Sequence, residues 1–210
     1  MRIIYDYSHL NGKEYLQVHF PMELQEIIDV ITGVNGEVWK KSAEKTKNER
    51  AQRVGQPYAK VYNQSAINAD FKEKFRQLGW NEKRYKYFAT TDEHTAREIM
   101  PLSANEGKAI IEERGLTAFP RGNQTDFMKN GIGIEVQFGK YSFVAYDFFV
   151  KHMTFFISGD INVGVEIIPT NKMLKDMDSG PANYEGEIFN LYRQGRNTPA
   201  VPLWVIGIEP

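Results

Sequence analysis

The sequence predicts an α/β fold in which a mixed β-sheet is flanked by α-helices. An Asn-Gly pair at 130–131 lies between two strand-like runs, TDFMK and IGIEVQF, and this arrangement is typical of a β-hairpin. A long apolar run of helix length, FVAYDFFVKHMTFFI, comes next and is followed by another strand-like run, INVGVEII. Two strands of one sheet that are joined by a helix run parallel. The sheet is therefore expected to combine an antiparallel hairpin with a parallel neighbour.

The other elements are predicted from hydrophobic spacing and turn residues. In chain order we expect a strand over 3–7, helices over 22–31 and 68–78, a strand over 84–90, helices over 105–114, 174–177 and 184–192, and a strand over 201–208. The Lys-rich segment 39–54 is compatible with an exposed helix or with a loop that becomes ordered on a partner. The chain is expected to form a single domain, 1–210, with a helical N-terminal part over about 1–115 and a core over about 120–210.

The composition excludes several classes of protein. There is no cysteine, which excludes disulfide scaffolds, thiol catalysis and cysteine-ligated zinc. The formal net charge of −1 argues against a uniformly basic surface, although seven Lys and Arg against two Glu lie within 39–60. No apolar stretch of signal-peptide or transmembrane length occurs, so we expect a soluble cytoplasmic protein with no membrane association.

The Asn-Gly turn predicts the register of the hairpin. A type I′ turn needs positive φ at both central positions, which suits Asn and Gly at 130–131. This register places Asp126 opposite Glu135 and Gln124 opposite Gln137. Because side chains alternate along a strand, Glu135 and Gln137 share the face of Asp126. The residues expected to point into the core are Ile134, Val136 and Phe138.

Asp126 and Glu135 form an unusual pair for a hairpin. Directly opposed residues have Cβ atoms about 4.5–5.5 Å apart, and two like charges at that separation repel. A divalent cation held by both carboxylates would neutralise them, and Mg²⁺ prefers oxygen ligands. The alternative is a solvent-exposed polar strand face with a different register, and the three polar positions alone do not exclude it.

Several stretches are similar to a known family: NQTDF, IEVQFGKYSFVAYDFFVKHM, VGVEI, YEGE and RQGR, with YSHLNG and QVHF near the start. Over most of its length the chain resembles the type II restriction endonucleases typified by BglII and BstYI, within the PD-(D/E)xK nuclease superfamily. The resemblance implies a restriction-endonuclease-like core in which Asp126 and Glu135 hold the catalytic metal, with the Val136 carbonyl as a further ligand. Two positions depart from the superfamily motif, because Thr125 replaces its proline and Gln137 replaces its lysine. A neutral amide cannot act as a cation, so Gln137 is expected to orient water or to bind the metal through its oxygen.

The resemblance also suggests residues outside the hairpin. Asn68 matches an active-site asparagine of the BglII branch, and the alternative is that it caps the helix that follows. Loops containing Lys140, Tyr141 and Ser179 are expected to reach DNA, with Lys140 and Ser179 contacting base edges in the major groove. An ordinary surface lysine and a turn serine are the alternatives.

Arg193 and Arg196 lie three residues apart at the end of a predicted helix, where both guanidinium groups could contact phosphates. Their alternative role is to compensate the negative C-terminal end of that helix.

Other titratable residues are expected to have structural roles. Glu166 is interpreted as an acid behind the metal ligands or, with more weight, as the partner of a buried base. Asp147 and Lys151, at i,i+4 spacing, are interpreted as a surface or interface salt bridge. The histidines have no metal-ligand spacing and are expected to be packed or surface residues: His9, His19, His94 and His152.

The function that the resemblance implies is site-specific hydrolysis of double-stranded DNA. We expect a homodimer that uses one or two Mg²⁺ ions per active site, with Mn²⁺ as a substitute, and cuts a six-base palindrome with a GATC core to leave a 5′ overhang. The implied setting is the cytoplasm of a prokaryote, with a cognate DNA methyltransferase that forms no stable complex with the nuclease. The alternatives are a structure-selective DNA repair nuclease on the same fold and a non-catalytic DNA-binding module.

Overall fold

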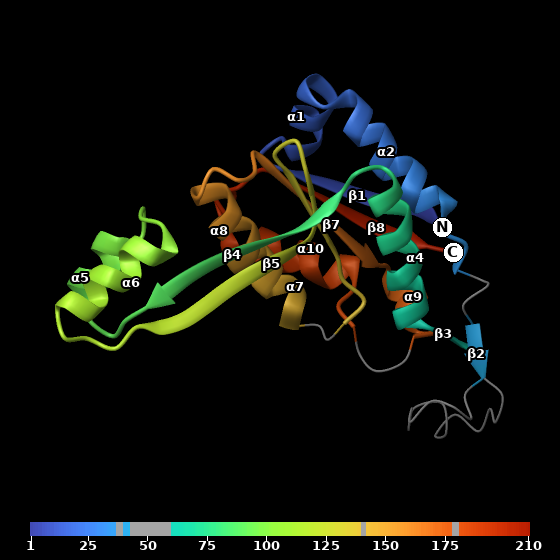
Figure 1. Cartoon of the computed structure of the whole chain (residues 1–210). Coiled ribbons are helices and arrows are strands. Elements are labelled where there is room, and N and C mark those ends of the chain that lie inside the picture. The colour runs from blue at the N-terminus through green and yellow to red at the C-terminus, as the bar shows by residue number, and fades with distance from the viewer. Residues whose placement is uncertain (37–39, 43–59, 140–141, 178–180) are drawn as a thin grey trace.

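A six-stranded mixed β-sheet with helices on both faces forms the body of the molecule (Figure 1). The computed structural model describes residues 1–36, 40–42, 60–139, 142–177 and 181–210. Strand order in the sheet is β1-β8-β7-β6-β5-β4. The neighbours β6, β7 and β8 are parallel, and the other three pairs are antiparallel. The mixed sheet and the parallel pair around the apolar helical segment are as predicted.

The strands of the sheet are β1 (Arg2–His9), β4 (Asn81–Ala89), β5 (Phe119–Lys129), β6 (Ile132–Val136), β7 (Val163–Pro169) and β8 (Leu203–Glu209). A separate two-stranded antiparallel sheet pairs β2 (Lys40–Ser42) with β3 (Lys60–Tyr62). Most of the Lys-rich segment 39–54 lies outside the described residues.

The helices that precede the central hairpin are α1 (Gly12–His19), α2 (Pro21–Gly33), α4 (Gln64–Gln77), α5 (Glu93–Ile99) and α6 (Ala104–Glu113). Those that follow it are α7 (Ser142–Tyr146), the π-helical turn η3 (Asp147–Lys151), α8 (His152–Ile157), α9 (Asn171–Leu174) and α10 (Tyr184–Gln194). No helix among the described residues is long and apolar enough to span a membrane.

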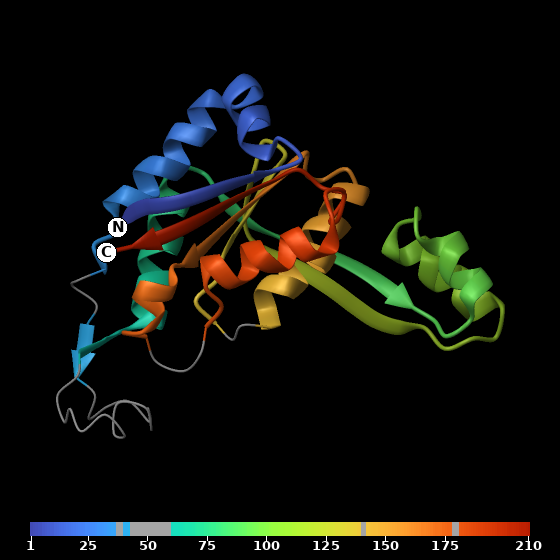
Figure 2. The same ribbon diagram turned by 180° about the vertical axis from the view of Figure 1, so that it is seen from behind.

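Two apolar clusters cover the two faces of the sheet. The larger one joins α2 and α4 to side chains such as Phe127, Ile134 and Val165. The smaller one joins η3 and α10 to the opposite face, through residues such as Phe148 and Leu203. Figure 2 shows from behind the helical layer that covers this opposite face and includes α10. Neighbouring strand residues point to opposite faces. The residues of β6 and β7 that alternate with the large-cluster side chains therefore face the layer of α7, η3 and α8.

The central hairpin has the predicted turn and register. Asn130 has φ 49° and Gly131 has φ 78°, as a type I′ turn requires. Strand pairing joins Phe127 to Ile134, Met128 to Gly133 and Lys129 to Ile132. The register prediction is therefore confirmed for the three pairs next to the turn. Ile134, Val136 and Phe138 are buried in the large cluster, also as predicted.

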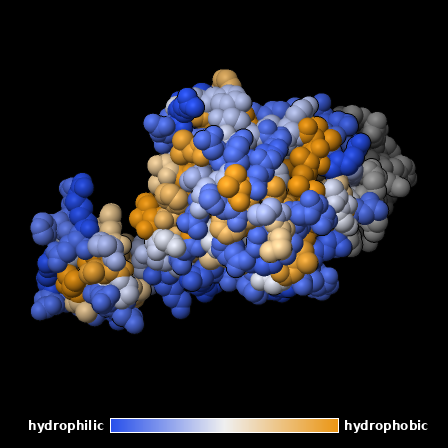
Figure 3. Space-filling view, turned by 90° about the horizontal axis from the view of Figure 1, so that it is seen from above, coloured by the Kyte–Doolittle hydropathy of each residue, from blue (hydrophilic) through white to orange (hydrophobic). Residues whose placement is uncertain are grey.

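Strands β4 and β5 continue beyond the sheet as a long two-stranded arm. Figures 1 and 3 show this arm projecting from the body, with α5 and α6 at its tip. At the tip Ile99 and Ile111 are buried, whereas Met100 and Phe119 are 70% and 41% exposed. The tip is thus a small helical unit with an apolar interior of its own.

Some helix boundaries differ from the prediction for identifiable local reasons. Helix α1 was not predicted, and it begins at Gly12, where a Cβ atom would lie 2.5 Å from the Leu203 backbone. The helix expected at 174–177 instead occupies 171–174, because the Thr170 side chain accepts a hydrogen bond from the Met173 amide and caps it there.

Candidate active site

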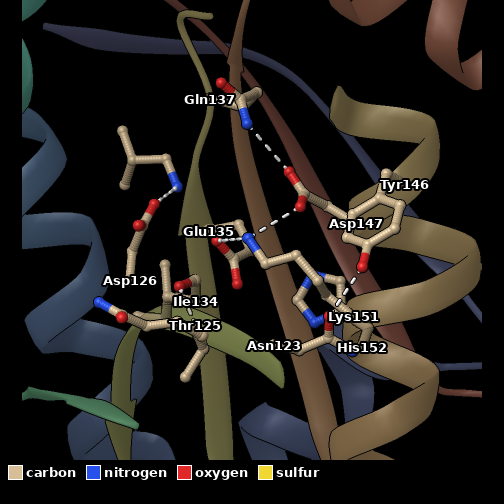
Figure 4. A network of polar contacts seen from close by, with 12 residues as sticks. Asn123, Thr125, Asp126, Ile134, Glu135, Gln137, Tyr146, Asp147, Lys151 and His152 are labelled. Carbon is tan, nitrogen blue, oxygen red and sulfur yellow. Dashed lines mark hydrogen bonds and ion pairs between the residues drawn. The ribbon is translucent and has the colours of Figure 1, made fainter. Parts of the chain in front are cut away.

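Asp126 and Glu135 lie on neighbouring strands at the end of the hairpin away from the turn (Figure 4). The amide of Val136 donates a hydrogen bond of 3.1 Å to Asp126 Oδ2, which ties this carboxylate to the neighbouring strand. The Thr125 hydroxyl donates to the carbonyls of Ile134 and Phe127, at 3.1 and 3.2 Å. Thr125, which stands where the motif has proline, therefore links β5 to β6 beside the two acids.

The other two predicted pairs of the register, Asp126 with Glu135 and Gln124 with Gln137, are not part of the strand pairing, which ends at Phe127 and Ile134. Strand β6 itself ends at Val136, one residue before Gln137. Gln124 instead bonds to β4, where its amide nitrogen donates to Glu82 and its oxygen accepts from Arg84. The prediction was wrong because the ladder that the turn imposes stops before it reaches these residues.

Glu135 is buried and ion-paired with a lysine from the helical layer. Its side chain is 2% exposed, and its Oε2 lies 2.6 Å from Lys151 Nζ. Lys151 Nζ also lies 2.8 Å from Asp147 Oδ1, and the Asp147 side chain is likewise 2% exposed. The predicted ion pair between Asp147 and Lys151 is therefore confirmed, but its expected location at the surface was wrong. Both residues point into the site because this side of their helical segment packs on the sheet.

Gln137 completes the network at the end of β6. Its Nε2 donates a hydrogen bond of 3.1 Å to Asp147 Oδ2, and its Oε1 accepts one of 2.8 Å from the Gly139 amide. Asp147 thus connects Gln137 to Lys151, with one oxygen on each (Figure 4). The amide of Gln137 is fixed at both ends by residues of the protein.

A π-helical turn carries Asp147 and Lys151. The turn spans Asp147–Lys151, and the amide of His152 donates to the Asp147 carbonyl. Such turns are rare and occur frequently at functional sites. The neighbouring α7 is anchored to β5, because the Tyr146 hydroxyl donates a hydrogen bond of 2.7 Å to Asn123 Oδ1. These contacts determine how the helical segment meets the hairpin.

The charges of the site are unbalanced, because three acids face one lysine. Burial raises the pKa of Glu135 well above its ordinary value, and Asp126 raises it further, while Lys151 acts in the opposite direction. Burial also raises the pKa of Asp147, against the effect of Lys151. For Lys151, burial lowers the pKa, but the charges of Glu135 and Asp147 outweigh burial and leave the pKa above its ordinary value. Lys151 is therefore charged, and the site retains an excess of acids.

Behind Glu135, a second buried pair lies within the same face of the sheet. Glu166 is adjacent to Glu135 in the parallel ladder, and its Oε2 lies 3.2 Å from His152 Nε2. Burial lowers the pKa of His152 to about 3, and burial followed by the charges of Asp147 and Glu135 raises the pKa of Glu166 well above its ordinary value. Glu166 Oε1 has no hydrogen-bond partner. The interpretation of Glu166 as the partner of a buried base is confirmed, and that base is His152.

The donor set suits a hard divalent cation bound through few protein ligands. Among the described residues, no group of three His, Asp or Glu side chains is placed to hold a metal ion. Asp126 and Glu135 are two carboxylates close enough for Asp126 to raise the pKa of Glu135. Mg²⁺ is commonly bound by one or two carboxylates, with water and substrate phosphate as its other ligands. The residues present therefore fit Mg²⁺, with Asp126, Glu135 and the Val136 carbonyl as the predicted ligands.

The other predicted site residues are not brought together by described contacts. Asn68 lies exposed within α4, whose N-cap is Asn63, so the alternative in which Asn68 caps this helix is wrong. Helix α10 ends at Gln194, so Arg193 and Arg196 do not share a helical face as expected. Both arginines are exposed, and Arg193 lies 5.9 Å from the Phe189 ring. The predicted DNA contacts Lys140, Tyr141 and Ser179 lie outside the described residues.

Sequence reasoning missed the roles of Lys151 and Asp147 in the site. The available signal was an acid and a lysine one helical turn apart inside FVAYDFFVKHMTFFI, a run that is otherwise apolar. Charged residues are rarely buried unless they are paired. That rule would have placed the pair against a polar group of the sheet rather than in solvent.

Comparison with known proteins identifies the family. A model of the restriction endonuclease BglII/BglIII family matches residues 5–208. None of the curated proteins matches the chain. The fold is similar to a crystal structure of free BglII, with a TM-score of 0.62, 15% identity, and coverage of 100% of this chain and 80% of that one. It is also similar to BglII complexed with a DNA 16-mer, with a TM-score of 0.61, 14% identity, and coverage of 100% and 78%. The chain belongs to the BglII/BglIII family of restriction endonucleases.

Proposed function

We propose that this protein is a Mg²⁺-dependent type II endonuclease that hydrolyses both strands of a short DNA palindrome. The observation that carries the proposal is the placement of Asp126 and Glu135 on adjacent strands, close enough for Asp126 to raise the pKa of Glu135, with more acids than bases around them. Membership of the restriction endonuclease family supports DNA as the substrate. A hard cation would relieve the excess charge and bring a phosphate to the two carboxylates.

The proposed reaction is attack of water on a phosphodiester. The water oxygen forms a bond to phosphorus as one P–O ester bond breaks, and a proton from the water ends on the leaving oxygen. Bound Mg²⁺ supplies Lewis-acid polarisation of the phosphate and lowers the pKa of the attacking water. Asp126 and Glu135 hold the ion, with Val136 contributing its carbonyl. Because the Asp126 carboxylate is bonded to the Val136 amide, the two ligand strands are held in register.

Recognition is proposed to involve residues other than the two acids. We infer that Lys140 and Ser179 read base edges, Tyr141 contacts the same DNA, and Arg193 and Arg196 contact phosphates. The two arginines are exposed and therefore available for such contacts. Asn68, exposed on α4, is proposed to contact the phosphate near the cut.

A palindrome has two equivalent strands, so cutting both requires two active sites related by a two-fold axis. We therefore propose a homodimer. The proposed target is a six-base palindrome with a GATC core that is cut to leave a 5′ overhang. Mn²⁺ is expected to substitute for Mg²⁺, with one or two ions in each site.

Digestion of a defined plasmid with Mg²⁺, followed by sequencing of the fragment ends, tests these statements together. We expect discrete fragments whose ends report the recognition sequence and the overhang. Asp126→Asn should abolish cutting while retaining DNA binding, because it removes a metal ligand and little volume. Asp29→Asn, at an exposed acid on α2, is the matched control and should cut normally.

Other outcomes would favour the other candidate functions. Cutting of branched DNA at no fixed sequence would indicate a structure-selective nuclease. Intact DNA with either Mg²⁺ or Mn²⁺, together with metal-independent binding, would indicate a non-catalytic binding module and refute the proposal.

A further inference from the structure

Lys151 supplies the positive charge of the site, because Gln137 stands where the superfamily motif has a lysine. Its ammonium contacts Glu135 Oε2 at 2.6 Å and Asp147 Oδ1 at 2.8 Å. The first of these acids is a proposed metal ligand, and it comes from a strand, whereas Lys151 comes from the π-helical turn. Positive charge thus reaches the end of β6 from the helical layer rather than from the strand.

Gln137 cannot supply this charge, and its contacts show a different role. The amide is neutral, its nitrogen donates to Asp147 Oδ2 and its oxygen accepts from the Gly139 backbone. Asp147 therefore receives Gln137 on one oxygen and Lys151 on the other. Through Asp147, Gln137 helps to determine where the lysine ammonium lies.

The ammonium of Lys151 also has capacity for one more contact. It carries three N–H donors, and among the described residues it has two acceptors, Glu135 and Asp147. Its side chain is 14% exposed, so it is not sealed from the surface. A donor at this position lies next to any group that binds to the Glu135 carboxylate.

We propose that Lys151 is a catalytic residue that donates a hydrogen bond to the phosphate during hydrolysis, and that Asp147 and Gln137 are its positioning residues. This inference rests on the proposed function. In the reaction, the water oxygen bonds to phosphorus, the P–O ester bond breaks and a proton from the water ends on the leaving oxygen. Lys151 keeps its protons and stabilises the negative charge that grows on the phosphate oxygens, an effect that is large in a buried site.

The first test compares Lys151→Met with Lys129→Met. Lys129 also pairs with an acid inside the fold, at 2.8 Å from Glu26, but it lies at the opposite end of the hairpin. We expect K151M to lower the single-turnover cleavage rate at saturating Mg²⁺ by about 100-fold or more, and K129M to leave it within a few-fold. Calorimetric titration with Ca²⁺, without DNA, should show that K151M binds the ion at least as tightly as wild type, because a competing positive charge has been removed.

Two results would overturn the role of Lys151. Wild-type cleavage by K151M at saturating Mg²⁺ would mean that the lysine only occupies the place of the metal ion. Loss of both Ca²⁺ binding and cleavage in K151M would mean that Lys151 only holds the Glu135 carboxylate in place. A wild-type protein that cuts no DNA would instead overturn the proposed function itself.

Two further comparisons extend the test, and the second, D147N, retains Lys151 and keeps the test decisive if K151M does not fold. Gln137→Lys combined with K151M returns an ammonium to the site from the strand, and we expect it to cleave at least tenfold faster than Q137M/K151M. Asp147→Asn retains the lysine but weakens its anchor, so we expect a lower single-turnover rate with unchanged affinity for DNA. Wild-type rates for D147N and no gain for Q137K/K151M would refute the proposal.

Discussion

Replacing Gly131 by alanine tests how strongly the turn holds the two acids in register. Gly131 has φ 78°, a conformation that costs an L-residue roughly 1–2 kcal/mol. A Cβ atom at this position would lie 2.7 Å from Asn162 Nδ2, so the Asn162 side chain must also move. Because Nδ2 is the far end of an exposed side chain, this movement adds little to the cost. We therefore expect G131A to lower the free energy of unfolding by about 1–2 kcal/mol.

Gly159 provides a matched control for the backbone term. Its φ is 77°, but no atom lies within 4 Å of the position that a Cβ would take. G159A should therefore cost only the roughly 1–2 kcal/mol of the left-handed conformation. G131A should cost about the same as G159A, and an Asn162→Ala background should leave that cost nearly unchanged, because the Asn162 side chain can move aside.

Denaturant titrations measure these differences directly. The midpoint should shift at constant slope, since neither substitution changes the surface exposed on unfolding. Single-turnover cleavage at a temperature where both variants are folded should be slower for G131A, because a misplacement of about 1 Å at a catalytic group can cost 100-fold. A cost of G131A well above that of G159A, removed by Asn162→Ala, would refute the reasoning.

Two other predictions concern the acids of the site. Glu166→Gln should become progressively more stable than wild type as pH rises above 4.5, by up to about 1.4 kcal/mol per pH unit, because the folded pKa of Glu166 lies above its unfolded value. The stability of wild type relative to E166Q is expected to fall with rising pH until the pH passes the folded pKa of Glu166. Unfolding titrations at pH 5, 6, 7 and 8 would follow this change. Without metal, Asp126→Asn should unfold at the same or a higher temperature than wild type, because it removes repulsion of Glu135 and retains an acceptor for the Val136 amide. Added Mg²⁺ should then raise the melting temperature of wild type more than that of D126N.

Each of these predictions has a contradicting outcome. The groups that surround Glu166 are unchanged in E166Q: Asp126, Glu135, Asp147, Lys151 and His152. A constant stability difference between E166Q and wild type from pH 5 to 8 would therefore show that Glu166 is ionised in the folded protein. Equal melting shifts with Mg²⁺ in wild type and D126N would show that the ion binds elsewhere.

Local chemistry made the hairpin predictable. Asn130 and Gly131 adopt positive φ values, which few other residues do cheaply, and this turn determines which strand residues face each other in the three pairs next to it. Alternation along β6 then separates the buried Ile134 and Val136 from Glu135. The parallel pairing of β6 with β7 followed from the helix between them, by general rules of connection.

The contacts that sequence patterns did not predict depend on tertiary packing. Lys151 and Glu135 are 16 residues apart, and their contact depends on how a helical segment with a π-turn lies on the sheet. Spacing within a single helix could suggest that Asp147 and Lys151 pair, but not which face they occupy. The hairpin ladder, which ends at Phe127 and Ile134, likewise stops beside a register shift between β4 and β5 at Asn81 and Lys83.

The pairing of β1 with β8 sets the order in which the sheet can be completed. Residues 2–9 find their partner only in residues 203–209, and β8 also supplies the second neighbour of β7. Contacts between such distant segments close slowly, because the entropy of a long loop must be lost before the pairing stabilises the fold. During synthesis, β1 therefore cannot pair until almost all of the described chain has been made. The β5–β6 hairpin, which carries the two acids of the candidate site, can form its local structure early, but the sheet beneath it is finished last.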